Sequence, residues 1–192
     1  MYRSLILTAL VLASPARAEL SASTDAGFVS DHAATVAAEP AAVWKVLIAP
    51  NQWWSPSHTY SGDAANLYLD AQATGCFCEK LPKPADAPEG QRMGSVEHMH
   101  VVYIDPQRGV LRMTGGLGPL QGEAVHGVLT ITLKKVGDGT QIKWRYAVGG
   151  VWQAKPAELA PLVDKVLAEQ VQRLADKAGG PMPDSAPLKL AP

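Results

Sequence analysis

Residues 53–63, WWSPSHTYSGD, bring several chemically active side chains into one short segment. The imidazole of His58 and the phenol of Tyr60 could transfer protons as a general acid and base, or could hydrogen-bond a bound molecule. Trp53 and Trp54 would supply an apolar surface beside them. Loops around a cavity commonly carry binding residues, so we interpret this segment as part of a site. The alternative interpretation is an ordered loop whose tryptophans pack inward while its polar residues face solvent.

Two pairs of potential metal ligands share a spacing of two residues, Cys76 with Cys78 and His98 with His100. In a strand, residues two apart point to the same face. Were the two strands adjacent and in register, two thiolates and one or two imidazoles could bind zinc or copper. A disulfide within Cys-x-Cys requires a geometry that a flat strand resists. Because cysteine is among the most frequently buried residues, we expect reduced, buried thiols and no metal site.

Three further residues combine an expected buried position with polar side-chain atoms. Trp144 and Tyr146 alternate with Lys143 and Arg145, which places the aromatic pair on the buried face of a strand. Gln170 falls on the apolar stripe of a helix, where its amide needs a partner from a ligand, a water molecule or another side chain. Core packing is the alternative role for these aromatics. The predicted ligand-binding residues, none of them assigned a catalytic role, are Trp53, Trp54, His58, Tyr60, Phe77, His98, Met113, Trp144, Tyr146, Val163 and Gln170.

These side chains must be positioned by secondary structure, and the apolar periodicity of the chain predicts both helices and strands. Helical spacing predicts a helix that begins near Pro40, a short helical turn over 51–54, and a long amphipathic helix from Pro156 or Pro161 to Ala178. Alternating or β-rich runs predict strands at 28–38, 66–70, 75–81, 95–104, 110–114, 127–136 and 140–148. This order predicts an α+β fold in which the long helix covers an antiparallel sheet.

Four local sequences resemble those of one fold family: AEPAAVW at 38–44, WW at 53–54, YIDP at 103–106 and GT at 139–140. With the order of elements, they make residues 28–178 similar to the helix-grip fold of the START and Bet v 1-like (SRPBCC) superfamily, in the branch of polyketide cyclases and Aha1-type domains. The resemblance implies a curved antiparallel sheet of about seven strands wrapped round the long C-terminal helix, with two short helices after the first strand.

The same resemblance implies a cavity between the sheet and the C-terminal helix. Members of the superfamily typically bind apolar or amphipathic small molecules there, and some cyclise or dehydrate them. None of the four local sequences is a catalytic motif, so the resemblance implies a cavity rather than named catalytic residues.

The N-terminus has the layout of a secretory signal peptide. Arg3 is followed by an apolar stretch over 5–13, and Ala16-Arg17-Ala18 is a small-residue cleavage signal. We therefore expect residues 1–18 to be removed and the mature protein to be periplasmic or secreted. Beside the domain at 28–178 we expect a flexible segment at 19–27 and a disordered tail at 179–192. A buried N-terminal helix is the alternative interpretation of the first residues.

Composition excludes several function classes. Apolar residues make up 47% of the 192 residues and charged residues 18%, which excludes a disordered chain. The net charge is −1 and no Lys/Arg cluster stands out, so nucleic-acid binding is not expected. No apolar run is long enough to span a membrane once the signal is removed. The sequence lacks nucleotide-binding, zinc-protease and serine-hydrolase motifs, and no cofactor is expected.

The combined prediction is an exported single-domain protein that binds an apolar or amphipathic small molecule in a cavity between the sheet and the C-terminal helix. The first alternative is a cyclase- or dehydratase-like enzyme that uses His58, Tyr60 or His98 as acid or base in the same cavity. The second alternative is an Aha1-like partner-binding module. Export disfavours this module, because cytosolic chaperone partners would be absent.

Overall fold

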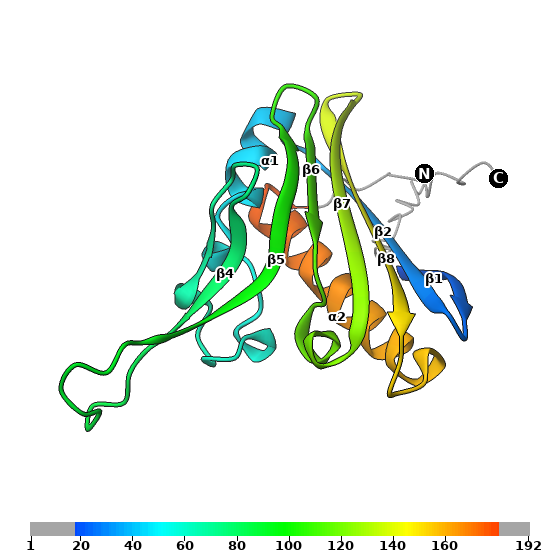
Figure 1. Cartoon of the computed structure of the whole chain (residues 1–192). Helices are drawn as coiled ribbons and strands as arrows, with labels where there is room; N and C mark the ends of the chain where they lie inside the picture. Colours follow the sequence, from blue (N-terminus) through cyan, green and yellow to red (C-terminus); the bar gives the residue numbers. More distant parts are fainter. Residues whose placement is uncertain (1–17, 181–192) are drawn as a thin grey trace, which may run out of the picture.

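The computed structural model describes residues 18–180, which form one antiparallel sheet with helices against its concave face (Figure 1). Within this range the strands are β1 Ala18–Thr24, β2 Gly27–Val36, β3 Leu67–Leu69, β4 Cys76–Leu81, β5 Gly94–Asp105, β6 Val110–Thr114, β7 Ala124–Val136 and β8 Gly139–Val151. The α-helices are α1 Pro40–Leu47 and α2 Pro156–Lys177. Short 3-10 turns are η1 Pro50–Gln52, η2 Pro56–His58, η3 Ala64–Asn66 and η4 Gly118–Gly122.

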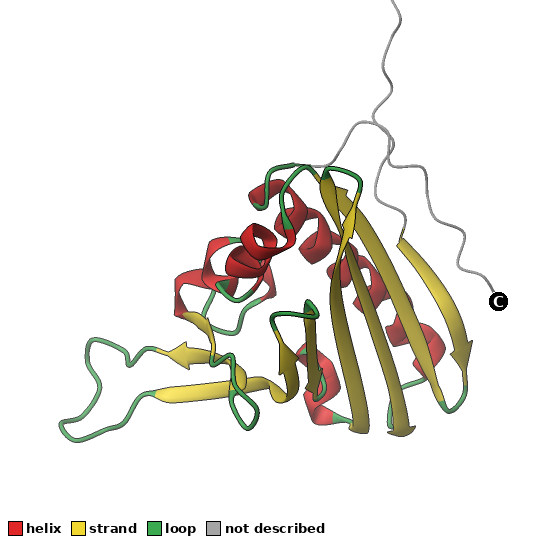
Figure 2. Ribbon diagram, turned by 90° about the horizontal axis from the view of Figure 1, so that it is seen from above, coloured by secondary structure: helices red, strands yellow, loops and turns green. Residues whose placement is uncertain are grey.

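The strand order in the sheet is β1-β2-β8-β7-β6-β5-β4-β3. Strands that are consecutive in sequence therefore lie side by side, except β2 and β3: β2 pairs with β8, and β3 lies at the far edge of the sheet. Figure 2 shows the helices gathered on one side of the curved sheet. The predicted α+β class and the helix-grip arrangement are confirmed. Residues 1–17 of the predicted signal peptide and residues 181–192 of the predicted tail lie outside the described range, whereas Ala18 is the first residue of β1.

The long helix α2 crosses the concave face and packs mainly against β1 and β2 (Figure 1). Its apolar residues recur at helical spacing, which gives one continuous buried stripe. The buried residues are Pro156, Ala160, Val163, Leu167, Gln170, Val171, Leu174 and Ala175. Of the helices in residues 18–180, none combines the length and the apolar character needed to cross a membrane.

The hairpin of β7 and β8 forms where the alternation of apolar and polar residues predicts it. Leu129 pairs with Tyr146, and Ile131 pairs with Trp144, so large apolar side chains line the same face of both strands. Gly137 opens the two-residue turn with φ +55°, a conformation that costs glycine little and that hairpin turns of this kind require. The hairpin therefore supplies the central apolar surface against which the helices pack.

The segment after β2 begins with α1, whose first residue is Pro40. Proline fits the first turn of a helix because the N–H it lacks has no intrahelical partner there. The second helical turn, predicted over 51–54, forms as the 3-10 turn η1. Together α1 and η1 hold the segment that carries Trp53 and Trp54.

The prediction of a flexible segment at 19–27 is wrong. Residues Ala18–Thr24 form strand β1, which pairs with β2 from Ala18 opposite His32 to Thr24 opposite Gly27. The sequence AELSAST alternates apolar and polar residues, but Leu20 is its one large apolar side chain, so the strand signal was weak. The physical reason for the strand is backbone pairing, because β2 would otherwise present an unpaired edge. The sheet consequently has one strand more than predicted.

Candidate functional site

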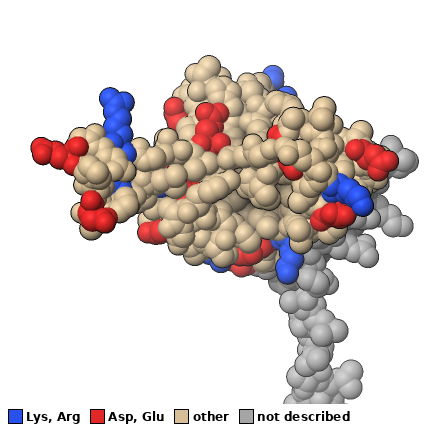
Figure 3. Space-filling view, turned by 60° about the horizontal axis from the view of Figure 1, so that its bottom comes forward, with Lys and Arg blue, Asp and Glu red and all other residues tan. Residues whose placement is uncertain are grey.

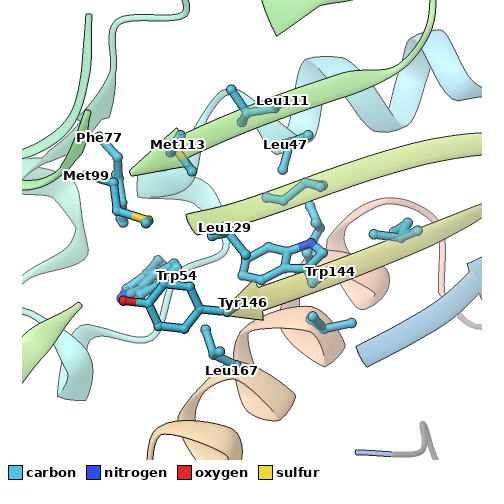
Figure 4. Close-up of a cluster of buried hydrophobic side chains, with 14 of the residues drawn as sticks. Leu47, Trp54, Phe77, Met99, Leu111, Met113, Leu129, Trp144, Tyr146 and Leu167 are labelled. Carbon is cyan, nitrogen blue, oxygen red and sulfur yellow. The ribbon is translucent and has the colours of Figure 1, made fainter. Parts of the chain in front are cut away.

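A small apolar cavity lies between the sheet and the α1–η1 segment. Its volume is about 20 Å³, counted as the space open to the centre of a water-sized sphere, which is room for about one water molecule. Every lining side chain is apolar or a tryptophan. The lining residues are Leu47, Pro50, Trp53, Trp54, Leu69, Phe77, Leu111, Met113, Leu117, Leu129, Ile131 and Trp144. Figure 4 shows Leu47, Leu111, Met113, Leu129 and Trp144 within one cluster of buried side chains.

The cavity does not lie under the C-terminal helix, where the sequence analysis placed it. No residue of α2 lines it. The apolar stripe of α2 packs directly on the sheet, and Leu167 points toward Tyr146 in Figure 4. The space remains instead under α1 and η1, which are short and connect through turns, so they cover the sheet less completely.

The structure places the predicted site residues in three groups. Trp53, Trp54, Phe77, Met113 and Trp144 line the cavity. Three others, Tyr146, Val163 and Gln170, are buried outside its wall. His58, Tyr60 and His98 are also outside the wall.

Several lining residues were not predicted. Leu129 and Ile131 carried a signal, because they alternate with threonines in β7. Leu69 and Leu117 carried none, since β3 is only three residues long and Leu117 lies in a turn between strands. Their place in the wall depends on the pairing of distant segments.

Trp144 and Tyr146 are both buried, but only the polar atom of Tyr146 is hydrogen-bonded within residues 18–180. The hydroxyl of Tyr146 donates to the carbonyl of Gly115 at 2.8 Å and accepts from the N–H of Leu117 at 3.1 Å. Burial raises the pKa of Tyr146, so the phenol stays protonated and fastens the turn between β6 and β7. The Trp144 ring packs edge-on against Trp53 with 6.0 Å between ring centroids. Its Nε1 has no hydrogen-bond acceptor within residues 18–180.

Helix α2 holds the loop 53–58 by polar contacts. Arg173 donates through Nε to the carbonyl of Trp53 at 2.8 Å, and Gln170 Oε1 accepts from the N–H of Ser55 at 2.9 Å. His58 Nε2 lies 3.0 Å from Glu169 Oε2. A hydrogen bond from the Ser55 side chain, with the neighbouring His58, holds the pKa of Glu169 below its usual range. We call these three contacts the latch, because they fix the segment that carries Trp53 and Trp54 over the cavity.

A second polar centre lies behind Phe77: His98 was predicted as a site residue, but its partner Glu79 was not. Glu79 is fully buried, and its carboxylate accepts from the backbone N–H groups of Tyr60 and Ser61 and from His98. Burial raises the pKa of Glu79, but the hydrogen bonds from Ser61 and Tyr60 outweigh it and hold the pKa below its usual value. For His98, burial disfavours the charged imidazolium and therefore lowers the pKa. A charged residue within an apolar strand was the available signal.

The geometry assigns Glu79 and His98 to loop positioning rather than to proton transfer in the cavity. The His98 ring stacks on Phe77 at 4.9 Å between centroids, so Phe77 separates it from the cavity. Tyr60 is 54% exposed, and its hydroxyl donates to the carbonyl of Gly118. His58 belongs to the latch.

A third polar cluster joins β2 to α2. Ser30 Oγ donates to Asp164 Oδ1 at 2.6 Å, and His32 Nε2 lies 2.8 Å from Ser30 Oγ and 3.1 Å from Asp164 Oδ1. In a nucleophilic triad the serine and the carboxylate contact opposite ring nitrogens, whereas here both contact Nε2. Ser30 is also fully buried. The cluster therefore fastens the helix to the sheet, and burial lowers the pKa of His32.

Cys76 and Cys78 form a disulfide, so the expectation of reduced thiols is wrong. The pairing of β4 with β5 shifts register between Phe77 and Cys78, which means that the strand is not flat there. The two Cα atoms are 5.4 Å apart, within the range that a disulfide spans. His100 pairs with Glu97 rather than with the sulfur atoms. Among residues 18–180, no group of three or more His, Cys, Asp or Glu side chains could hold a metal ion, so the structure does not support the zinc or copper alternative.

The surface carries charges of both signs. On the face seen in Figure 3, acidic and basic side chains are interspersed around a broad uncharged area. The ion pairs on the surface include Arg145 with Asp31, whose side chains lie on neighbouring strands. Such exposed pairs contribute little to stability.

Comparisons with known proteins agree with this architecture. A family model described as "Polyketide cyclase / dehydrase and lipid transport" matches residues 28–179. Among solved structures, Ara h 8.0201 is 13% identical, with a TM-score of 0.52 over 78% of this chain and 96% of its own. The EF2215 protein of Enterococcus faecalis is 14% identical, with a TM-score of 0.50 over 92% of this chain and 82% of its own. At these identities the likeness shows the fold alone. No curated protein matches the chain.

Proposed function

Since the chain belongs to the polyketide cyclase / dehydrase and lipid transport family, we propose that it binds an apolar or amphipathic small molecule in the cavity under α1 and η1. The membership confirms the resemblance predicted from the sequence. The observation that carries the proposal is the cavity wall, in which twelve apolar or tryptophan side chains converge from the sheet, from α1, η1 and the loop after η1, and from the turn between β6 and β7. Binding sites for small molecules are typically lined in this way.

The structure corresponds in this proposal to a closed form. A cavity of about 20 Å³ is far smaller than the roughly 300 Å³ or more of typical ligand sites. Ligand entry therefore requires the loop 53–58 to move away from α2. That movement breaks the latch, whose three contacts are polar and can be exchanged for contacts with water. The contacts of His58 and Arg173 are already partly exposed, whereas the contact between Ser55 and Gln170 is buried.

The cyclase- or dehydratase-like alternative requires an acid and a base that face the bound molecule. The three residues considered for this role, His58, Tyr60 and His98, are engaged with Glu169, Gly118 and Glu79 outside the cavity wall. This arrangement favours binding over acid–base chemistry. Turnover of a bound molecule by the wild-type protein would instead support the enzyme.

We further propose that the protein is exported to the periplasm or the medium. The signal-peptide pattern of residues 1–18 supports this proposal. The Cys76–Cys78 disulfide supports it as well, because disulfides persist in oxidising compartments.

The binding proposal is tested with a variant that fills the cavity. Leu69 lines the cavity but is only partly buried on the short strand β3, so Leu69→Trp can add volume with limited strain. Its neighbour Tyr68 is 41% exposed, and Tyr68→Trp is the matched control. A thermal-shift and calorimetric screen of fatty acids, polyketides and polycyclic aromatics should find compounds that bind the wild type. Leu69→Trp should weaken their binding about tenfold or more, while Tyr68→Trp should not. A screen without any binder would refute the proposal.

A further inference from the structure

We propose that the ligand carries an uncharged hydrogen-bond acceptor, such as the carbonyl oxygen of a ketone or an ester, which accepts from the indole N–H of Trp144. The inference rests on the proposed function, because it concerns the same cavity. It names the chemical class of the ligand and the residue that selects it.

Trp144 differs from Trp53 and Trp54 in that its indole N–H has no hydrogen-bond acceptor within residues 18–180. Trp53 Nε1 donates to the carbonyl of Val46 at 2.9 Å, and Trp54 Nε1 donates to the carbonyl of His58 at 2.9 Å. The Trp144 ring lines the same cavity and is 2% exposed, yet its Nε1 has no acceptor among the residues that the structure describes. Buried N–H groups are nearly always paired, and an unpaired one is unfavourable. No polar atom of the described chain lines the cavity in this closed form, so a ligand acceptor would reach this N–H and supply the missing partner when the cavity opens.

A second unpaired donor lies close to the same pair of tryptophans. Gln170 is fully buried, and its Oε1 accepts from the N–H of Ser55. Because Ser55 N can only donate, the amide oxygen must face it, and Nε2 is left without an acceptor in residues 18–180. Ser55 directly follows Trp54, while Trp144 packs on Trp53. Both unpaired donors therefore belong to residues that contact the loop 53–58, and both require an acceptor, but Trp144 is the one that lines the cavity.

The charge of the surroundings favours a neutral acceptor over a carboxylate. The cavity wall contains no cationic side chain. Arg173 is exposed, and its Nε already donates to the carbonyl of Trp53. A carboxylate moved from water into such a site would lose its hydration without an opposite charge. A carbonyl oxygen loses less, and one or two N–H donors are sufficient partners for it.

The test compares three probes of nearly equal shape: methyl naphthyl ketone, isopropenylnaphthalene and naphthoic acid. The first presents a carbonyl oxygen where the second presents a methylene group and the third a carboxylate at neutral pH. Isothermal titration of the full mature chain should show the ketone binding about tenfold more tightly than the hydrocarbon, the size of one buried hydrogen bond. The acid should bind more weakly than the ketone.

Two variants assign the preference to Trp144. Trp144→Phe removes the N–H and keeps an aromatic ring, so the ketone should lose its advantage over the hydrocarbon. Trp53→Phe is the matched control, since Trp53 lines the same cavity but its N–H is already paired within the protein. In that variant both affinities should fall together, and their ratio should stay. The ratio within each variant cancels the loss of packing that both substitutions cause.

A spectroscopic measurement covers the case in which Trp144→Phe does not fold. In a nitrogen-15 NMR spectrum of the wild type, the Trp144 indole N–H signal should shift downfield with the ketone and not with the hydrocarbon. Equal binding of the ketone and the hydrocarbon, with no such shift, would overturn this inference and leave the binding function standing. Binding of none of the three probes would overturn this inference together with the cavity's proposed role. Tighter binding of the acid than of the ketone would overturn the choice of a neutral acceptor alone.

Discussion

His98 donates through Nε2 to the carboxylate of Glu79 at 2.9 Å, and both side chains are buried at the back of the cavity wall. The same carboxylate accepts from the backbone of Tyr60 and Ser61. One residue of strand β4 therefore holds the loop of residues 60–61 and orients a histidine of strand β5.

We expect Glu79→Gln to reduce the free energy of unfolding by about 2–4 kcal/mol. The substitution removes the charged acceptor, and it places an amide NH2 group, itself a donor, opposite the N–H donors of Tyr60, Ser61 and His98. Urea denaturation of the purified protein measures the change. Glu89→Gln, in the exposed loop between β4 and β5, is the control and should change the stability little. A loss as small as that of the control would mean that Glu79 does not hold the loop.

Stability should fall as the pH drops below about 6.5. Burial lowers the pKa of His98, with Glu79 opposing, and it lowers the pKa of His32, with Asp164 opposing. In the unfolded chain both histidines return to a pKa near 6.5, so below that pH the unfolded state binds more protons than the folded state. The lowered pKa of Glu79 acts in the same direction at more acidic pH.

The check is a series of urea titrations between about pH 7.5 and about pH 5.5, in which the free energy of unfolding should decrease steadily. His98→Gln should flatten the dependence, whereas His126→Gln, at an exposed position of β7, should leave it in place. Stability that rises toward acidic pH would show that His98 and His32 gain protons on folding instead.

Loosening the latch should speed ligand entry. In the double variant Glu169→Gln and Arg173→Met, the contacts of α2 with His58 and with the Trp53 carbonyl are weakened or lost. Because these side chains are partly exposed, the stability should change by about 1 kcal/mol or less. Hydrogen exchange over residues 53–58 should become faster. Lys177→Met, on the exposed surface of the same helix, is the control. Unchanged exchange in the double variant would show that other contacts hold the loop.

The disulfide between Cys76 and Cys78 predicts how many thiols react before and after reduction. The unfolded, unreduced protein should give no reaction with a thiol reagent, and both Cys76 and Cys78 should react after reduction. Reduction should also weaken ligand binding, because the two cysteines flank Phe77, which lines the cavity and packs on Trp54 at 5.0 Å. A double variant, Cys76→Ser with Cys78→Ser, should bind as weakly as the reduced protein. Two reactive thiols in the unreduced protein would contradict the disulfide.

Export predicts the first residue of the mature chain. N-terminal sequencing of protein from the periplasm or medium of its own host should begin at Glu19. A cytosolic protein that keeps Met1 would refute export without affecting the cavity.

The parts of this structure that could be predicted are those in which neighbouring residues carry the information. Alternation along residues 140–148 identified Trp144 and Tyr146 as buried, and helical spacing identified the stripe of α2. Strand β1 escaped prediction because its pairing with β2 depends on backbone hydrogen bonds, which any sequence can make.

The site was less predictable because its contacts join distant segments. Glu79 acquires its role from residues 60, 61 and 98, and the latch joins residues 53–58 to 169–173. Side chains such as His58 and Tyr60 have the chemistry of a site, but their direction depends on those contacts. The C-x-C disulfide required a register shift in β4 that no local pattern indicates.

The position of β2 between β1 and β8 sets an order of assembly. Apart from its hairpin with β1, this N-terminal strand has a sheet partner only in residues 139–151, more than a hundred positions later. Contacts between such distant segments form slowly, because the intervening chain must first be closed into a loop. A nascent chain that ends before Gly139 leaves both β2 and β7 with an open edge. The eight-stranded sheet is therefore completed only after nearly all of the residues up to Val151 have been synthesised.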